Sequence, residues 1–162
     1  MPAYLQTRGY ATALMATIAG FRGTPDNVNE AVAVRMHRAR VLHKSDHRLA
    51  ALLEENVLHH QVDDQDMMAG QLGRLLTSMP LPSMSLGVIR ATAAREGSMW
   101  PLEQFTVFDD SRIHVELLAA KVTITAPGEL DICLRTFTRL TELAVYGADA
   151  RTLIVEAIDA LR

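Results

Sequence analysis

The chain has 162 residues, of which 49% are hydrophobic and 22% are charged, and its formal net charge is -3. This length and apolar content suit one domain with one sizeable core, so we expect a single domain over residues 1–162. The acidic balance provides no basic field to attract a phosphate backbone, which argues against direct binding of nucleic acid.

One cysteine and the lack of a long apolar stretch bear on the compartment. Cys133 has no partner for an internal disulfide, which fits a reducing environment. Because it falls within an apolar helical pattern, we interpret it as a buried small hydrophobe rather than a nucleophile. No run reaches the roughly 18 apolar residues of a membrane helix, and no signal-peptide pattern opens the chain. We therefore expect a cytoplasmic protein without membrane contact.

Two helices are predicted in the first 44 residues. Thr7 can cap the first helix, which would end at Gly20. Thr24 can cap the second, with Pro25 at the first helical position, where its missing amide costs nothing. The second helix carries apolar residues at spacings of four and three, namely Val28, Val32, Met36, Ala39 and Leu42.

Basic residues gather toward the end of this second helix and just beyond it. They are Arg35, Arg38, Arg40, Lys44 and Arg48, with His37, His43 and His47 between them. Runs of charge are usually solvated, so we interpret this cluster as a solvated helix face. An anion site is the alternative.

The middle of the chain alternates strand and helix patterns. The almost wholly apolar run from Leu49 to Leu53 predicts a strand. Helical spacing then returns, with Asp63 or Asp64 as the cap and Pro80 at the end. Residues 84–88 alternate large apolar and small residues, which is typical of a strand, and residues 91–99 are predicted to form a loop.

The last third is predicted to contain a hairpin and two helices. The segment LEQFTVFDDSRIHVELL, residues 102–118, predicts two strands joined at Asp109, Asp110 and Ser111. A short strand, VTIT, follows it and precedes a Pro-Gly turn. Two apolar stripes then predict helices, one from Leu130 to Ala144 and one from Leu153 to Leu161. We expect an α+β fold: an antiparallel-rich sheet of four to five strands covered by about five helices.

The stretch LEENVLHHQV, residues 53–62, holds carboxylates close to two adjacent histidines. Adjacent side chains point about 100° apart on a helix and to opposite faces on a strand, so His59 and His60 cannot jointly chelate one ion. The H-E-x-x-H pattern of zinc proteases is absent. We expect no metal and no cofactor, interpret His59 as a surface residue, and regard Glu55 as the leading candidate for a site.

A second candidate site lies in the hairpin. If Ile113 and Val115 face one layer, His114 and Glu116 face the other, on the side of Gln104 in the partner strand. These polar residues either reach solvent or line a pocket. Trp100, just ahead of the hairpin, would be core or rim packing, or else a lid over a ligand.

The methionines of the middle region allow two interpretations. Met67, Met68, Met79, Met84 and Met99 fall between the third predicted helix and the loop before Trp100. Because methionine adapts to irregular cavities, they suit either a core or an adaptable binding surface, and we favour the core. The sequence contains no G-x-S-x-G elbow, no active-site cysteine signature and no glycine-rich phosphate loop.

Several segments, taken together, resemble the uncharacterised effector domain that follows the helix-turn-helix in many actinobacterial XRE-like, antitoxin-like transcriptional regulators. The segments are PAYLQTRGYATALM, TPDNVNEAVAVRMHRARVLHK, LLEENVLHHQV, QLGRLLTSMPLPSMSLGVI, PLEQFTVFDD, IHVEL and RLTELAVYGADARTLI. They cover nearly the whole chain in the family's order. Glu55 and Glu116 fall where the family usually has acidic residues, and Trp100 falls near its glycine-rich turn. The sequence begins inside this domain, so we expect no DNA-binding domain in it.

The resemblance implies an effector domain that senses a small molecule or a partner protein in transcriptional regulation, as a homodimer or in a complex with a helix-turn-helix protein. The ligand-binding candidates are Glu55, Trp100, Gln104 and Glu116. The alternative is a standalone enzyme of specialised metabolism, of cyclase or isomerase type. Its acid–base candidates are Glu55, Glu116, His114 and His60. An antitoxin-like protein that works through its surface is a third possibility.

Overall fold

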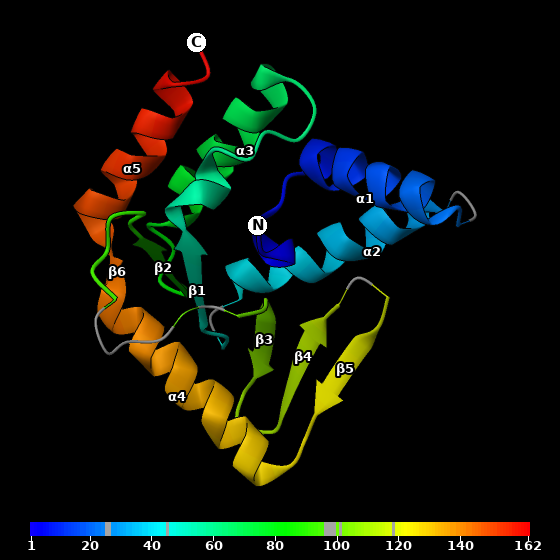
Figure 1. Cartoon of the computed structure of the whole chain (residues 1–162). Helices are drawn as coiled ribbons and strands as arrows, with labels where there is room; N and C mark the ends of the chain where they lie inside the picture. The colour runs from blue at the N-terminus through cyan, green and yellow to red at the C-terminus, as the bar shows by residue number, and fades with distance from the viewer. Residues whose placement is uncertain (25–26, 45, 96–99, 101, 118) are drawn as a thin grey trace. The chain divides into compact units, whose positions relative to one another are not determined.

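The computed structural model describes residues 1–24, 27–44, 46–95, 100, 102–117 and 119–162 (Figure 1). The chain divides into two compact units: residues 1–91 with 145–162, here the first unit, and residues 92–144, here the second unit. The predicted α+β class with about five helices is confirmed. The strands form two three-stranded sheets, in place of the expected single sheet of four to five strands. The organisation as one domain stays a prediction.

The first unit begins with a short 3-10 helix, η1 (Ala3–Leu5), and helix α1 (Arg8–Arg22). Thr7 caps α1 as predicted, because its hydroxyl accepts the backbone N–H of Tyr10 at 3.2 Å. We expected α1 to end at Gly20, but it ends at Arg22. Gly23, at φ 62°, takes the left-handed conformation that closes the helix, so Gly20 stays within the last turn.

Helix α2 (Val28–Ala39) runs into the 3-10 helix η2 (Arg40–His43). The residue that precedes α2 is Asn27 and not the predicted cap, Thr24. The hydroxyl of Thr24 instead donates to the carbonyl of Ala19 at the end of α1, and Pro25 lies outside the described residues. Helices α1 and α2 pack through a small cluster of buried residues, namely Ala11, Val28 and Val32.

The sheet of the first unit consists of β1 (Leu49–Glu54), β2 (Met84–Ile89) and β6 (Ala144–Val145), in the order β1-β2-β6. Strands β1 and β2 are parallel, from Leu49 opposite Met84 to Glu54 opposite Ile89. The sequence patterns did not predict the direction of this pair, and antiparallel pairs of the expected antiparallel-rich fold are found in the second unit. The 3-10 helix η3 (Glu55–Leu58) and helix α3 (Gln65–Ser78) carry the chain back to the start of β1, which makes the next strand parallel.

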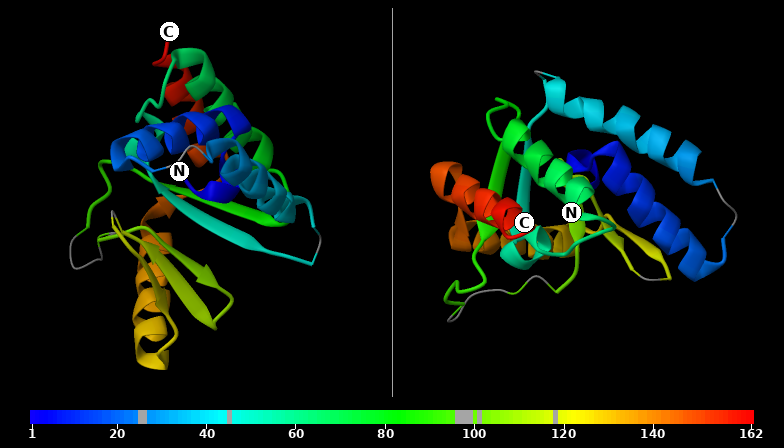
Figure 2. Two further views of the ribbon diagram at one scale, coloured as in Figure 1. Left: turned by 90° about the vertical axis from the view of Figure 1, so that its right-hand side faces the viewer. Right: turned by 90° about the horizontal axis from the view of Figure 1, so that it is seen from above.

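Helices α3 and α5 (Gly147–Asp159) lie side by side and cover this sheet (Figures 1 and 2). Asp64 caps α3, as one of the two predicted candidates, by accepting the backbone N–H of Met67 at 2.7 Å. The main core lies between the helices and β2. Its fully buried side chains include Leu72, Leu75, Val88 and Ile154. Met68 is also fully buried there, as the core interpretation of the methionines requires, while Met99 lies outside the described residues.

The second unit contains β3 (Phe105–Phe108), β4 (Arg112–Glu116), β5 (Lys121–Ile124) and α4 (Pro127–Leu143). The predicted hairpin is confirmed, since β3 and β4 pair antiparallel around residues 109–111. Ile113 and Val115 face a small core that includes Leu130 and the partly buried Cys133 of α4. The expected Pro-Gly turn is wrong, because Pro127 opens α4, where a missing N–H breaks no helical hydrogen bond.

Candidate functional site

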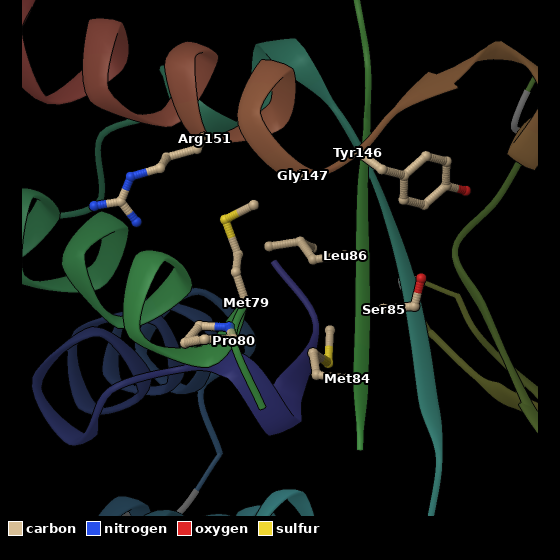
Figure 3. Close-up of a pocket in the computed structure, with 8 residues that line it drawn as sticks. All are labelled: Met79, Pro80, Met84, Ser85, Leu86, Tyr146, Gly147 and Arg151. Carbon is tan, nitrogen blue, oxygen red and sulfur yellow. The ribbon is translucent and has the colours of Figure 1, made fainter. Parts of the chain in front are cut away.

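An open groove of about 370 Å³ lies in the first unit where the end of α3, the start of β2 and the start of α5 meet (Figure 3). We call it the α5 groove. Its lining residues are Met79, Pro80, Met84, Ser85, Leu86, Tyr146, Gly147 and Arg151. Pro80 follows the last residues of α3 and prevents the helix from continuing. Strand β6 has 2 residues and β2 has 6, so β6 can pair with only part of this side of β2.

The α5 groove combines an apolar wall with one cation. Figure 3 shows Met79, Leu86 and Arg151 around one space, whereas Tyr146 and Ser85 lie on the other side of β2. Arg151 is exposed, and no ion pair joins it to a carboxylate within the described part of the chain. The groove can therefore hold an apolar body while offering an unneutralised guanidinium to an anionic group.

Tyr146 owes its position to a glycine on the neighbouring strand. A Cβ at Gly87 would lie 2.7 Å from Cε1 of Tyr146 and 2.9 Å from Cδ2 of Leu52. Only a residue without a side chain leaves room for the tyrosine ring at this place. Partial burial raises the pKa of Tyr146, so its phenol stays protonated at neutral pH.

Glu55 lies at the start of η3, directly after β1, and is half-buried. Its Oε2 accepts the backbone N–H of Ala91 at 2.7 Å, which ties the end of β1 to the segment that follows β2. His59 and His60 follow η3 and are exposed. None of the three lines the α5 groove.

The hairpin residues lie in the second unit. His114 pairs with Thr106 across the strands and Glu116 pairs with Lys121, on the face opposite the buried Ile113 and Val115. Gln104 and Glu116 are exposed, as expected for a solvated face. Trp100 is 61% exposed, which excludes the core interpretation of this residue. Its lid interpretation involves residues 96–99 and 101, which lie outside the described residues.

His114 is half-buried and contacts the ring of Phe108, with ring centroids 4.6 Å apart. The guanidinium of Arg112 lies 4.9 Å from the centroid of the same ring. Partial burial and the charges of Lys121 and Arg112 lower the pKa of His114, while Glu116 acts in the opposite direction. At neutral pH the imidazole is therefore uncharged and could accept a proton.

The family described as "Domain of unknown function (DUF5753)" matches residues 1–156. The chain belongs to this family. No curated protein and no solved structure matches the chain. The description of the family assigns no ligand or reaction. A ligand or reaction for this DUF5753 domain is therefore argued from its own residues.

Among the described residues, no three His, Cys, Asp or Glu side chains are placed so that they could hold a metal ion. Within the same residues, every helix is too short or too polar to cross a membrane.

Sequence reasoning named Met79 and Met84 as core or adaptable binding-surface methionines, but it identified neither Arg151 nor the α5 groove of this DUF5753 domain. Met79 and Leu86 lie seven residues apart, whereas Arg151 comes from a segment that is distant in the sequence, and each looks ordinary in its own segment. The signal that could have found them is YGADAR, residues 146–151, where a glycine after an aromatic residue opens a helix that carries a lone arginine. That pattern is common, and only the fold places it beside Met79.

Proposed function

We propose that this chain is a ligand-binding effector domain, and that its ligand is a small amphipathic carboxylate bound in the α5 groove. The observation that carries the proposal is the exposed Arg151 beside the apolar wall formed by Met79 and Leu86. An arginine can hold a carboxylate through two parallel hydrogen bonds. Methionines adapt to apolar bodies of different shape, so the groove suits a ligand whose hydrophobic part varies.

Binding is better supported than catalysis. The acid–base candidates Glu55 and His60 lie outside the α5 groove, and Glu55 is already engaged by the N–H of Ala91. A site for an acid–base reaction would need such a group within hydrogen-bond reach of the bound molecule.

The place in transcriptional regulation rests on the resemblance to the effector domains of actinobacterial XRE-like, antitoxin-like regulators. Under this proposal, ligand binding changes association with a second copy of the chain or with a helix-turn-helix protein. Sedimentation of the purified chain, with and without ligand, tests the first arrangement. A chain that stays monomeric throughout, and that captures no helix-turn-helix protein from its native host, would contradict the link to regulation.

The binding test uses phenylbutyrate and its uncharged amide as probes, followed by shifts of backbone NMR resonances. We expect shifts at residues 79–86 and 146–151 with the carboxylate, and binding about tenfold weaker with the amide. Arg151→Gln should abolish this preference for the carboxylate. Arg38→Gln is the matched control, because Arg38 is an exposed arginine outside the groove. Equal binding of acid and amide to the unaltered chain would refute the carboxylate assignment.

A further inference from the structure

A second groove in the first unit, of about 240 Å³, lies where α1 begins, α2 ends and α3 passes. We call it the basic groove. Its lining residues are Gln6, Thr7, Met36, Ala39, Arg40, His43 and Arg74. It shares no lining residue with the α5 groove.

Three lining residues of the basic groove are basic, and none of its lining residues is acidic. Arg40 and His43 come from η2, while Arg74 comes from α3 and is partly buried. Within the described residues no carboxylate forms an ion pair with any of the three. Arg40 and His43 are exposed to solvent, which screens their charge, but positive charge gathered around one hollow still favours the binding of an anion there.

The polar rim of the basic groove is rigidly held. Arg35 donates from Nη1 to Oε1 of the buried Gln6 at 2.7 Å. The fully buried Gln71 accepts the N–H of Thr7 at 2.8 Å and donates to the carbonyl of Leu5 at 2.9 Å. These bonds fix residues 5–7, so this wall of the groove is formed before any ligand arrives, while the side chains of Arg40, His43 and Arg74 take no part in them.

The start of α1 adds to the same field. Thr7 lines the basic groove and is also the N-cap of α1, a helix of 15 residues. The N-terminal end of a helix carries partial positive charge and free N–H groups. The partial charge at the start of α1 adds to the positive potential of the three basic side chains, and it would not define an anion site without them.

We infer that the basic groove binds a compact dianion of the phosphate type, either a phosphate monoester or free phosphate. Arg74 and Arg40 supply charge-assisted hydrogen bonds from two different elements, and the imidazole of His43 adds a further N–H donor. Double-stranded DNA does not fit, because the site is a small hollow and the chain as a whole is acidic.

For Arg40 and His43 we favour an anion site, which was the alternative to a solvated helix face for the basic cluster. His37, Arg38 and Lys44 are exposed and line neither groove, as the solvated-face interpretation expects. Arg40 and His43 are also exposed, but they line the basic groove together with Arg74, which is distant in the sequence.

The test is calorimetric titration of the whole chain with inorganic phosphate and, separately, with phenyl phosphate. We expect saturable binding that Arg74→Gln and Arg40→Gln each weaken about tenfold. Arg38→Gln removes the same charge outside the groove and should leave affinity within about twofold. Thermal unfolding checks that each variant is folded, and Arg74→Lys replaces Arg74→Gln if the latter is not.

The results distinguish a phosphate monoester from free phosphate, and they distinguish binding in the basic groove from binding in the α5 groove. Tighter binding of phenyl phosphate than of phosphate indicates a phosphorylated small molecule, and equal binding indicates the free ion. Arg151→Gln should not change either affinity, so failure of the α5 groove proposal leaves this one intact. Absence of saturable binding, or an equal loss with Arg38→Gln, overturns the inference.

Discussion

The side-chain carbonyl of Gln71 in α3 accepts the backbone N–H of Thr7 at 2.8 Å, although 64 residues separate them. The same side chain donates to the carbonyl of Leu5 at 2.9 Å and is fully buried. One amide therefore satisfies two buried backbone groups at the point where η1 gives way to α1.

We expect Gln71→Leu to lower the free energy of unfolding by about 2–4 kcal/mol, because it leaves a donor and an acceptor unpaired in the core. Urea unfolding followed by circular dichroism measures the change. The matched control is Gln65→Leu in the same helix, which is exposed and should change stability by no more than about 0.5 kcal/mol. A loss from Gln71→Leu no larger than that of the control would contradict the bridging role.

Two glycine substitutions should change stability in opposite directions. Gly87→Ala places a methyl group 2.7 Å from Cε1 of Tyr146, and we expect it to destabilise the fold by about 1–3 kcal/mol. Gly70→Ala lies in α3, where an added Cβ meets nothing within 4 Å. It should stabilise the fold by about 0.5–1 kcal/mol, because glycine is a poor helix former. The midpoints of thermal unfolding measure both changes in stability. If Gly87→Ala leaves the midpoint unchanged, the ring of Tyr146 can move aside.

The pKa of His114 should lie below 6.5 and should respond to its charged neighbours. Glu116→Gln removes the group that favours the charged imidazole, so it should lower the pKa further. Lys121→Gln removes a repelling charge and should raise it. An NMR titration of the imidazole protons measures all three values. Shifts of the same sign in both variants would contradict this account of the electrostatics.

The lowered pKa of His114 also sets the sign of a pH effect on stability. Between the folded pKa and 6.5 the unfolded chain binds more protons than the folded one. The contribution of His114 is thus fully present above pH 6.5 and is lost as the pH falls toward the folded pKa. We expect His114→Gln to flatten the fall in stability over that window. Chemical unfolding at several pH values measures the difference from the unaltered chain.

Cys133 should react slowly with thiol reagents. Burial, followed by the charges of Glu103 and Glu129, raises the pKa of its thiol and so reduces the thiolate fraction. At pH 8 we expect the folded chain to react several-fold more slowly than the unfolded chain, judged by release of a coloured thiolate. Glu129→Gln should speed the reaction, and Glu142→Gln is the control on the same helix. An unchanged rate in Glu129→Gln would argue that access alone limits the reaction.

Local patterns predicted most of the elements, because a cap, an apolar period or a turn signal involves residues that are close in the sequence. Thr7, Asp64 and the turn at residues 109–111 are examples. Predictions failed where two local signals competed. Gly20 and Gly23 could both end α1, and the left-handed conformation at Gly23 decided between them.

Long-range relationships were beyond such reasoning. The parallel pairing of β1 with β2 depends on the path of the chain through α3, and a strand pattern alone carries no direction. The α5 groove combines residues from the end of α3, β2 and the start of α5, and the basic groove combines residues from the start of α1, α2, η2 and α3, so no spacing in the sequence reveals them. Glu55 was identified as worth attention, and the structure gives it a hydrogen bond to the backbone of Ala91. Its role in ligand binding stays a prediction.

Residues 90–143, which include most of the second unit, separate β2 from β6 in the chain, although the two strands are neighbours in one sheet. Leu153 and Ile154 of α5, which are buried in the core of the first unit, are therefore made after the whole of the second unit. During synthesis on the ribosome, residues 1–91 therefore keep apolar surface exposed until residues 145–162 have been added. The second unit needs only residues 92–144, which are continuous in the sequence, so its contacts can form as soon as that segment has emerged. The second unit can therefore complete its contacts before the first unit, although the first unit begins earlier in the chain.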